Sequence, residues 1–434
     1  MKAGAHDSPK MSRRSMAIAA FSTVVEWYDF TLYLYFATVL SRVFFGGGGT
    51  SLGFILGGFA VAYLMRPLGA AVFGHIGDRY GRRRMMLLSM ALMTAAMLAT
   101  AMLPTHAQIG PAAGWLLLLL RCMMAFSVGG EYTGVVAYLL EGARASRRGL
   151  VTSLAAAASE VGGLLAAGVA ALTVSLIGVR ELDAWGWRIP FLIGAALAAV
   201  VWIARSAMQE SPDFERQEVS GTVPQNPLRH TLANHRVGIL RGFAISALGS
   251  ITYYVGITYV PVFLASTGGM TEADALWLST AAALVVILVT PLTGALSDRI
   301  GRKPVLVGVC VCAAVLPVVM FSLMAGGSHG WILCGALVLA AVGGGVSAVG
   351  SVATAEQFPG EGRLSGLALG VTSATAIFGG LAPYVAHLLV ESSGFPIVPG
   401  VMIAAVALGV LPVLLRMTET RPVRAELKPR LQTE

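Results

Sequence analysis

The sequence contains little charge for its length. Only 12% of its 434 residues are charged, whereas 56% are hydrophobic. A water-soluble chain of this size needs a larger polar surface. The hydrophobic residues gather in repeated runs of about 20, the length that crosses a bilayer core as a helix. This composition excludes an ordinary soluble domain and predicts an all-α membrane protein.

Cysteine is also scarce, and no pattern of catalytic or metal-binding residues stands out. The four cysteines lie inside apolar segments without the spacing of a metal site or a disulfide framework, so we expect them to be packing residues: Cys122, Cys310, Cys312 and Cys334. We find no nucleophile–base constellation and no phosphate loop. No cleavable signal peptide is evident, because the first apolar run contains Glu26 and Asp29 and no small-residue cleavage site follows it. We therefore expect no enzyme activity, no cofactor and no metal.

The net charge of +8 does not form a single basic patch, which argues against a nucleic-acid partner. The basic residues lie between the apolar runs, mostly in segments on one side of the predicted membrane. The exceptions are Arg42, Arg180 and Arg188 in the opposite loops, and Arg66 and Arg121 inside spans. Because cytoplasmic loops are enriched in Lys and Arg, we expect both termini to be cytoplasmic in a bacterial inner membrane.

Twelve apolar runs predict twelve transmembrane helices. One long polar stretch divides them into two sets of six. The predicted organisation is an N-terminal cytoplasmic segment 1–16, a six-helix bundle 17–208, a cytoplasmic linker 209–239, a second six-helix bundle 240–416 and a cytoplasmic tail 417–434.

The two halves contain the same motifs in the same order. Segment 74–83 (GHIGDRYGRR) matches segment 294–303 (GALSDRIGRK). Two further pairs are Glu141 and Arg148 against Glu356 and Arg363, and the GGL motifs at 162–164 and 379–381. The three offsets are 220, 215 and 217 residues. A parallel repeat of this kind predicts two pseudo-symmetric bundles related by an axis along the membrane normal.

The two loop motifs at 74–83 and 294–303 resemble the signature of the major facilitator superfamily. Further segments narrow the resemblance to its metabolite:proton symporter family, which includes carriers of α-ketoglutarate, citrate, shikimate and proline/betaine: 26–30 (EWYDF), 66–69 (RPLG), 129–132 (GGEY), 187–191 (WRIPF), 210–214 (ESPDF) and 377–383 (IFGGLAP). This resemblance implies secondary active transport by alternating access, with proton-driven uptake of a small organic acid or zwitterion. The tail has no heptads, so we do not expect the coiled coil of the osmosensing members.

Charged residues deep in a membrane are costly and therefore candidates for function. All of those in the predicted spans lie in the first half: Glu26, Asp29, Arg66, Arg121, Glu131 and Glu160. Ser22, Glu26, Asp29 and Tyr33 form one stripe of a helix, which cannot face lipid. Our candidates for proton coupling are the four carboxylates, Glu26, Asp29, Glu131 and Glu160. The alternative is that some of them form permanent structural ion pairs, Glu26 or Asp29 with Arg66 or Arg121, and Glu131 with Arg66.

Arg121 is the candidate anchor for a substrate carboxylate, because its planar guanidinium forms bidentate bonds and stays charged. The alternative is a permanent pair with Glu26 or Asp29. The other candidate substrate-binding residues are tyrosines: Tyr33, Tyr253, Tyr254 and Tyr259. We interpret His387 as a packing residue at a helix end.

The repeated loop motifs are candidates for a gate. We expect Asp78 to lie against the N-terminal end of the eleventh helix near Arg363, and Asp298 against the fifth helix near Arg148. The remaining gating candidates come from the same loops: Arg79, Gly81, Arg82, Arg299, Gly301 and Arg302. Contacts of this kind would hold the cytoplasmic mouth shut and break as the halves rock.

Two other functions fit the architecture. A proton-driven exporter is the main alternative, although the proline expected in its fifth helix is missing here. A membrane sensor normally needs an added soluble module, which we do not find. The expected partners of the protein are a carboxylate or zwitterionic metabolite, protons and the lipid bilayer, and we expect a monomer.

Overall fold

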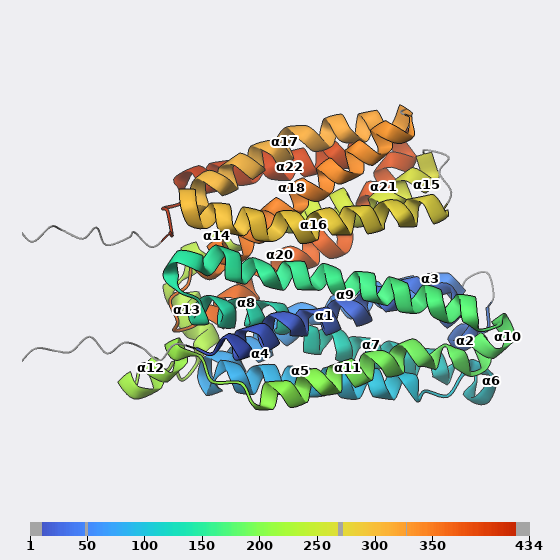
Figure 1. Cartoon of the computed structure of the whole chain (residues 1–434), viewed down its shortest axis with the longest axis horizontal. Coiled ribbons are helices and arrows are strands. Elements are labelled where there is room, and N and C mark those ends of the chain that lie inside the picture. The colour runs from blue at the N-terminus through green and yellow to red at the C-terminus, as the bar shows by residue number, and fades with distance from the viewer. Residues whose placement is uncertain (1–10, 48–50, 268–271, 327, 422–434) are drawn as a thin grey trace, which may run out of the picture.

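The structure, a computed structural model, describes residues 11–47, 51–267, 272–326 and 328–421. Within these ranges every regular element is helical. The helices form two stacked bundles, the first coloured blue to green and the second yellow to red (Figure 1). Two short helices, α12 (Pro212–Ser220) and α13 (Pro227–Asn234), lie between the bundles in sequence and at one end of the molecule, which we call the linker face. The opposite end is the far face.

The first bundle contains six spanning segments, of which three are built from two helices each. They are α1 (Arg13–Tyr35) with α2 (Ala37–Phe45), α3 (Ser51–Tyr63) with α4 (Met65–Tyr80), α5 (Arg82–Ala101), α7 (Ala112–Gly129) with α8 (Glu131–Gly142), α9 (Arg148–Leu176) and α11 (Arg188–Ser206). Short helices α6 (His106–Ile109) and α10 (Val179–Glu181) connect segments at the far face.

The second bundle repeats this arrangement. Its segments are α14 (Arg236–Tyr253) with the π-helical turn η3 (Tyr254–Thr258) and α15 (Val260–Thr267), then α16 (Glu272–Ile300), α17 (Arg302–Gly326), α18 (His329–Ala355), a composite eleventh segment and α22 (Val398–Arg416). The eleventh segment consists of α19 (Arg363–Leu367), η4 (Ala368–Thr372), α20 (Ser373–Thr375), η5 (Ala376–Leu381) and α21 (Ala382–Ser393). The bounds give the twelve predicted segments.

Nine of the described helical segments are long and apolar enough to cross a membrane. The other three are the first, second and seventh segments, each of which is interrupted near its middle or carries buried charge. The outer surface of the bundles is apolar. In α16, for example, Leu284, Leu288 and Leu292 are 51%, 65% and 69% exposed, an arrangement that suits contact with lipid chains.

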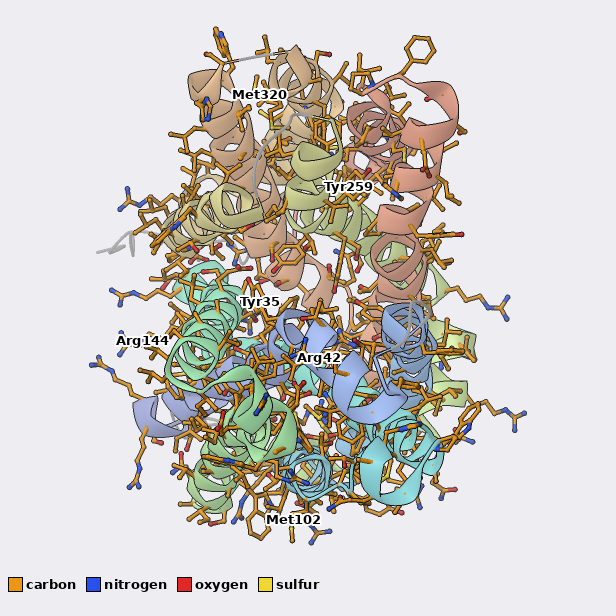
Figure 2. All side chains as sticks on the ribbon, turned by 90° about the vertical axis from the view of Figure 1, so that its right-hand side faces the viewer. Tyr35, Arg42, Met102, Arg144, Tyr259 and Met320 are labelled. Atoms are coloured by element: carbon orange, nitrogen blue, oxygen red, sulfur yellow. The ribbon has the colours of Figure 1, made fainter. Side chains whose placement is uncertain are left out.

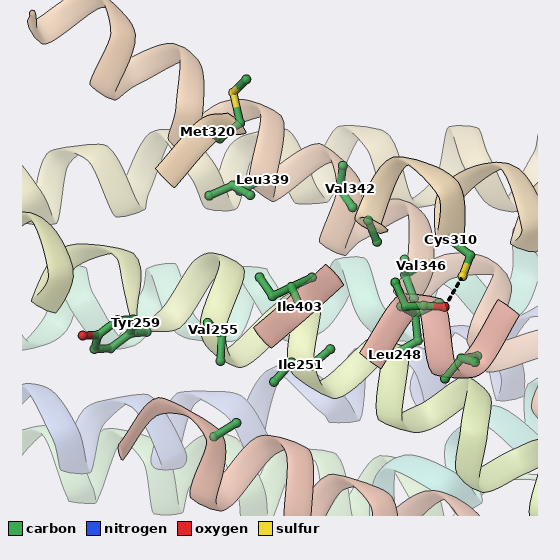
Figure 3. Packing of buried hydrophobic residues seen from close by; sticks show 14 of the residues in the cluster. Leu248, Ile251, Val255, Tyr259, Cys310, Met320, Leu339, Val342, Val346 and Ile403 are labelled. Atoms are coloured by element: carbon green, nitrogen blue, oxygen red, sulfur yellow. Dashed lines mark hydrogen bonds between the residues drawn. The ribbon is translucent and has the colours of Figure 1, made fainter. Parts of the chain in front are cut away.

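Each bundle has its own hydrophobic core. In the second bundle, Leu248 and Ile251 of α14 pack with Val346 of α18 and Ile403 of α22 (Figure 3). Cys310 is fully buried in this core and its Sγ donates a hydrogen bond to the Ala407 carbonyl at 3.2 Å. This placement confirms that Cys310 is a packing residue, whereas Cys312 and Cys334, for which the same was predicted, are exposed on their helices.

The bundles meet closely where α9 packs along α16. A Cβ atom at Gly149 would lie 2.4 Å from the Gly294 carbonyl oxygen, and one at Gly294 would lie 2.6 Å from the Gly149 carbonyl oxygen. Only glycine fits at both positions, because small residues allow two helix backbones to approach within contact distance. Gly294 belongs to the loop motif found in the sequence, so this motif also fixes the packing between halves.

Candidate functional site

A cavity of about 180 Å³ lies between the two bundles. The first bundle contributes its charged lining, Glu26 from α1, Arg66 from α4 and Glu160 from α9. The second bundle contributes neutral residues, among them Ser250 and Tyr253. This division agrees with the prediction that the first half carries the deep charges.

The three cavity charges lie at nearly the same depth. Counted along their helices from the linker face, Glu26, Arg66 and Glu160 are each roughly 20 Å from the helix end, about the middle of a bilayer. Glu26 is 2% exposed and its Oε2 accepts no hydrogen bond from the described residues. Its neighbour Trp27 also lines the cavity, with a buried Nε1 that has no hydrogen-bond partner among those residues.

Arg66 forms no ion pair with a described carboxylate. Its guanidinium instead lies over two aromatic rings, 4.6 Å from the Tyr63 centroid and 4.9 Å from that of Phe30. Glu26 is close enough to attract it electrostatically without forming an ion pair. Arg66 is therefore a half-buried cation that lines the cavity, and its side chain also has a hydrogen bond with Tyr63.

A smaller cavity of about 40 Å³ lies inside the first bundle and shares Glu26 and Arg66 with the central one. Asp29, Tyr33 and Arg121 line it. Arg121 Nη1 and Asp29 Oδ2 form an ion pair at 2.7 Å, and both side chains are at most 5% exposed. Arg121 also contacts Thr100 Oγ1 at 3.2 Å and lies 5.2 Å from the centre of the Tyr33 ring.

The sequence suggested two arrangements for Arg121, a substrate anchor or an ion pair with Glu26 or Asp29. The structure shows the ion pair, with Asp29 of α1. It does not line the central cavity, whereas Arg66 does. The role of Arg121 as a substrate anchor stays a prediction, because a substrate could compete with Asp29 for the guanidinium. Arg66, considered from the sequence only as a structural partner, is a second candidate because it lines the central cavity.

Glu131 lies outside the central cavity. It forms an ion pair with Arg205 of α11, and its Oε2 accepts a hydrogen bond from Ser89 at 2.6 Å. Arg205 also donates to Ser22 and to the Met86 carbonyl, the latter at 2.6 Å. The structure replaces the predicted pair with Arg66 by a pair with Arg205, whose Nε has no hydrogen-bond partner among the described residues, and a role of Glu131 as a proton site stays a prediction. Sequence reasoning missed Arg205 because it lies near the end of the sixth span and was counted with the basic loops.

The four candidate tyrosines separate into different environments. Tyr253 and Tyr254 line the central cavity, and Tyr33 lines the smaller one and donates to the Ile55 carbonyl at 3.2 Å. Tyr259 is a correction, because it lines neither cavity. It is 3% exposed within the second bundle, packed against Phe263 and His387 (Figure 2).

The far-face side of the central cavity is closed by aromatic contacts. Tyr63 of α3 and Tyr254 of η3 share a hydrogen bond of 2.6 Å between their hydroxyls, one turn nearer the far face than Arg66. Trp27 and Tyr253 meet edge to face with ring centroids 5.5 Å apart. Both contacts join the two bundles across the mouth of the cavity.

The linker-face side is closed by the repeated loops. Asp78 accepts hydrogen bonds from the backbone N–H groups of Leu364 and Ser365 at 3.2 and 2.8 Å, at the start of α19. Asp298 accepts two from Gly149 and Leu150, both at 2.9 Å, at the start of α9. These are the contacts predicted from the repeat, and both cross between bundles. Their role in gating stays a prediction.

The buried arginines of the loops hold these contacts in place. Arg82 binds Glu141 at 3.0 Å and reaches the other bundle through the Gly360 carbonyl at 2.8 Å. Arg302 binds Asp298 at 2.8 Å and Glu356 at 3.3 Å. Arg79 donates to the Gln225 carbonyl in the linker, and Arg299 is exposed.

The two sides of this gate are not equivalent. Arg363 bridges the bundles by contacts with Glu141 at 2.5 Å and with Asp213 of α12 at 3.0 Å. Its repeat partner Arg148 begins α9 but forms no ion pair with a described carboxylate, and its Nε has no hydrogen-bond partner. The linker therefore strengthens one side of the gate only.

Gly81 and Gly301 place the loops by adopting backbone angles that other residues avoid, with φ values of +102° and +115°. Beside each glycine a carboxylate accepts the first backbone N–H groups of the next helix. Glu210 accepts from Arg82 at 2.9 Å, and Glu419 accepts from Arg302 at 2.8 Å.

These carboxylates reveal a fourth repeat that the sequence reading missed. Segments 208–211 (MQES) and 417–420 (MTET) follow the last helices of the two halves. Burial raises the pKa of Glu210, while backbone N–H bonds outweigh the effect of burial at Glu419 and lower its pKa.

Comparison with known proteins places this site in a family. The profile described as "Sugar (and other) transporter" matches residues 15–221, and that of the Major Facilitator Superfamily matches residues 243–433. The α-ketoglutarate permease of Escherichia coli is 36% identical over 385 residues, which cover 86% of this chain and 87% of the permease. The ectoine/proline transporter of Corynebacterium glutamicum is 32% identical over 430 residues, covering 95% of this chain and 85% of that protein.

This chain belongs to the major facilitator superfamily. It is a multi-pass membrane transporter and not an enzyme. The citrate-proton symporter of Salmonella typhi is a further relative, 32% identical over 389 residues, covering 88% of this chain and 89% of the symporter.

Solved structures show the superfamily fold. The proton:xylose symporter XylE, bound to 6-bromo-6-deoxy-D-glucose, matches with a TM-score of 0.80 at 18% identity, covering 94% of this chain and 96% of XylE. The human organic anion transporter MFSD10 matches with a TM-score of 0.66 at 16% identity. The central cavity of this chain lies at the interface of the two repeats, where substrate sites of such transporters are found.

Proposed function

We propose that this protein is a proton-coupled symporter that imports a small metabolite carrying a carboxylate group. The observation that carries the proposal is Arg66, a guanidinium that faces the central cavity without an ion-pair partner among the described residues. Relatives named for α-ketoglutarate, citrate with protons, and proline with betaine or ectoine support a carboxylate-bearing substrate.

Arg66 suits a carboxylate for geometric and electrostatic reasons. A guanidinium presents parallel N–H groups that match the two carboxylate oxygens, and such bonds strengthen where water is excluded. The rings of Tyr63 and Phe30 lie against the guanidinium, which has a hydrogen bond with Tyr63 and no ion pair with a described carboxylate. A substrate carboxylate can therefore bind there without first breaking an internal ion pair, as it would have to at Arg121.

Glu26 is the proposed proton carrier. It lines both cavities, lies close to Arg66 and leaves Oε2 without a hydrogen-bond partner among the described residues. A substrate carboxylate on Arg66 would offset the attraction between Arg66 and Glu26, so Glu26 would then bind a proton more readily. Because such linkage is reciprocal, proton and substrate binding would favour each other, typically by about 1–3 kcal/mol.

The gates fit alternating access in a bacterial inner membrane. We propose that the linker face is cytoplasmic, since it contains the basic loops with Arg79, Arg83 and Arg144. The hydrogen bonds of Asp78 and Asp298 would open as the bundles rock towards the cytoplasm, and the Tyr63–Tyr254 contact would open towards the periplasm. Each bundle has its own core and the cavity is complete within one chain, so we propose a monomer as the transporting unit.

Transport by purified protein in proteoliposomes tests this function. The labelled probes are glycine betaine, proline, α-ketoglutarate and citrate, each with the vesicle interior alkaline, with no pH gradient and with the gradient reversed. We expect at least one probe to accumulate only when the interior is alkaline, and a protonophore to abolish the accumulation. Accumulation only when the interior is acidic would indicate antiport and export, and equal final levels under all three gradients would exclude proton coupling.

A further inference from the structure

Glu160 is a buried charge that the proposed carboxylate site and proton carrier do not use. It lies on α9 on the opposite side of the cavity lining from α4, at the depth of Arg66, and is 9% exposed. Its side chain has a hydrogen bond with Tyr253 of the other bundle. Within the described part of the chain, no Lys, Arg or His forms an ion pair with it. An ionised carboxylate at this depth without a cationic partner is costly, and the cost is removed when it binds a proton or when a ligand supplies the positive charge.

The charges of the central cavity do not balance. Its described lining contains two carboxylates, Glu26 and Glu160, and one guanidinium, Arg66. Protonation of Glu26 during transport leaves one carboxylate and one guanidinium, a pair of opposite charges with no direct contact between them. A ligand with both an anionic and a cationic group would complement this cavity, whereas a ligand with two carboxylates would place its second negative charge near Glu160.

Aromatic rings lie beside the carboxylate. Tyr253 is hydrogen-bonded to Glu160 and meets Trp27 edge to face at 5.5 Å, and Tyr132 and Tyr254 also line the cavity. The faces of such rings attract ammonium groups, including methylated ones that have no N–H to donate. Trp27 and Glu26 line the same cavity, and the buried Trp27 Nε1 and Glu26 Oε2 have no hydrogen-bond partner among the described residues.

We infer that Glu160, with Trp27 and Tyr253, forms a subsite for the cationic nitrogen of the substrate, and that this transporter selects zwitterions over dicarboxylates. The inference rests on the proposed function for the placement of the substrate carboxylate at Arg66. The ligand class is a small molecule with one carboxylate and one ammonium or quaternary ammonium group, short enough to bridge Arg66 and Glu160. Glu160 is then the residue that determines substrate class.

Equilibrium binding to the purified full chain, without any pH gradient, tests the subsite separately from transport. The ligands are two pairs that differ only in the charged nitrogen: glycine betaine with 3,3-dimethylbutanoate, and proline with cyclopentanecarboxylate. Succinate represents dicarboxylates. We expect at least one zwitterion to bind about 10-fold or more tightly than its nitrogen-free analogue, which keeps the carboxylate but lacks the cationic group, the range expected for an interaction with a charged group. A failure of coupling in the transport assay leaves this measurement unaffected.

Substitutions of Glu160 test whether this residue causes the preference for zwitterions. In Glu160→Gln, the ratio of dissociation constants within a pair should fall to about 2 or less, while binding of the nitrogen-free analogue, which has no cationic group to lose a contact, is not weakened. Glu160→Asp should keep part of the ratio, because it keeps the charge. Glu181→Gln removes an exposed carboxylate at the far face and serves as the matched control, with an unchanged ratio.

Three results would overturn the inference. The first is a nitrogen-free analogue that binds as tightly as its zwitterion in both pairs. The second is the absence of binding of either zwitterion, whether or not succinate binds. The third is a Glu160→Gln protein that keeps the wild-type ratio but loses proton-driven accumulation, since this result would make Glu160 a proton carrier.

Discussion

The two deep arginines of the first bundle differ in their surroundings, although the sequence places both inside predicted spans. Arg121 is paired with Asp29 at 2.7 Å inside the bundle, whereas Arg66 rests on aromatic rings at the edge of the central cavity. A guanidinium with a permanent carboxylate partner binds a second carboxylate weakly, because the partner must first be displaced. The structure therefore separates an arginine that holds the bundle together from one that is available to a ligand.

Replacing each arginine by lysine tests this difference. Arg66→Lys keeps the charge but loses the planar fork, so we expect binding of carboxylate ligands to weaken by about 10-fold or more. Arg121→Lys is the matched control and should leave the dissociation constant within about 2-fold of wild type, because its side chain does not line the cavity. The measurement is equilibrium binding at fixed pH. Weakened binding in Arg121→Lys with near-wild-type binding in Arg66→Lys would instead identify Arg121 as the substrate anchor.

The buried pair of Glu131 and Arg205 predicts a pattern in stability. Removing one partner leaves an uncompensated buried charge, so Glu131→Gln and Arg205→Met should each destabilise the protein, by up to about 3–5 kcal/mol. The double variant should recover much of this loss. Thermal unfolding in detergent measures the stabilities of the wild type, the two single variants and the double variant. Glu215→Gln, on the exposed surface of α12, is the control.

The same double variant also tests function. Because Glu131 does not line the central cavity, we expect the folded double variant to keep proton-driven accumulation. Loss of accumulation with intact exchange would make Glu131 a coupling residue after all.

At the scale of elements, the loop motifs act through helix ends. An aspartate that accepts two backbone N–H groups at the start of a helix binds donors that have no partner inside that helix, and it also complements the helix dipole. Asp78 does this for α19 and Asp298 for α9, each across the boundary between bundles. The motif thus converts a short loop into a contact that can form or break as a unit.

Asp78→Asn should weaken the linker-face gate. The amide keeps the shape of the carboxylate but loses its charge, so we expect the protein to favour states open to the linker face and to turn over more slowly, with little change in equilibrium substrate affinity. A single cysteine in place of Leu367, a buried lining residue, should react faster with a thiol reagent in this variant. Asp183→Asn at the far face is the control, and unchanged turnover and labelling in Asp78→Asn would argue against the gate.

The glycines of the motif predict a second effect at this scale. A Cβ at Gly81 would lie 2.4 Å from Glu210 Oε2, and one at Gly301 would lie 2.6 Å from Glu419 Oε2. Because both glycines also have positive φ, Gly81→Ala and Gly301→Ala should each destabilise the protein by about 1–3 kcal/mol. Gly308→Ala in α17 meets no atom within 4 Å and should be neutral or slightly stabilising. Melting temperatures of the three variants test this difference in stability. A Gly308→Ala variant destabilised as much as the other two would contradict the prediction.

At the scale of the whole molecule, repetition made the fold predictable. The paired loop motifs and the apolar runs are enough to predict two six-helix halves, because each motif follows the corresponding helix of its half. The stripe of Ser22, Glu26, Asp29 and Tyr33 was also informative, since all four side chains are at most 2% exposed. Periodicity predicts which face of a helix is buried.

Partners across the bundle could not be predicted in the same way. Which side chains contact Arg205, Arg121 or Arg66 depends on the rotation and offset of packed helices, and a single sequence does not contain this information. The π-helical turns η3, η4 and η5 were missed because the sequence pattern remains that of a continuous helix, although each turn contains a glycine, Gly256, Gly370 or Gly379. The repeat at Glu210 and Glu419 was visible in the sequence, but only the structure shows that both residues cap helices.

The central claim is that Glu26 takes up the proton beside a substrate held at Arg66. Uptake by Glu26→Gln protein in proteoliposomes, with the interior alkaline, tests it most directly, with counterflow of the same labelled substrate as the measure of a folded and substrate-competent protein. We predict that uphill accumulation is lost while counterflow persists, because a glutamine can neither bind nor release the proton. Accumulation equal to that of wild type in Glu26→Gln, together with its loss in Asp29→Asn, would contradict the claim and move the proton site to the Asp29–Arg121 pair.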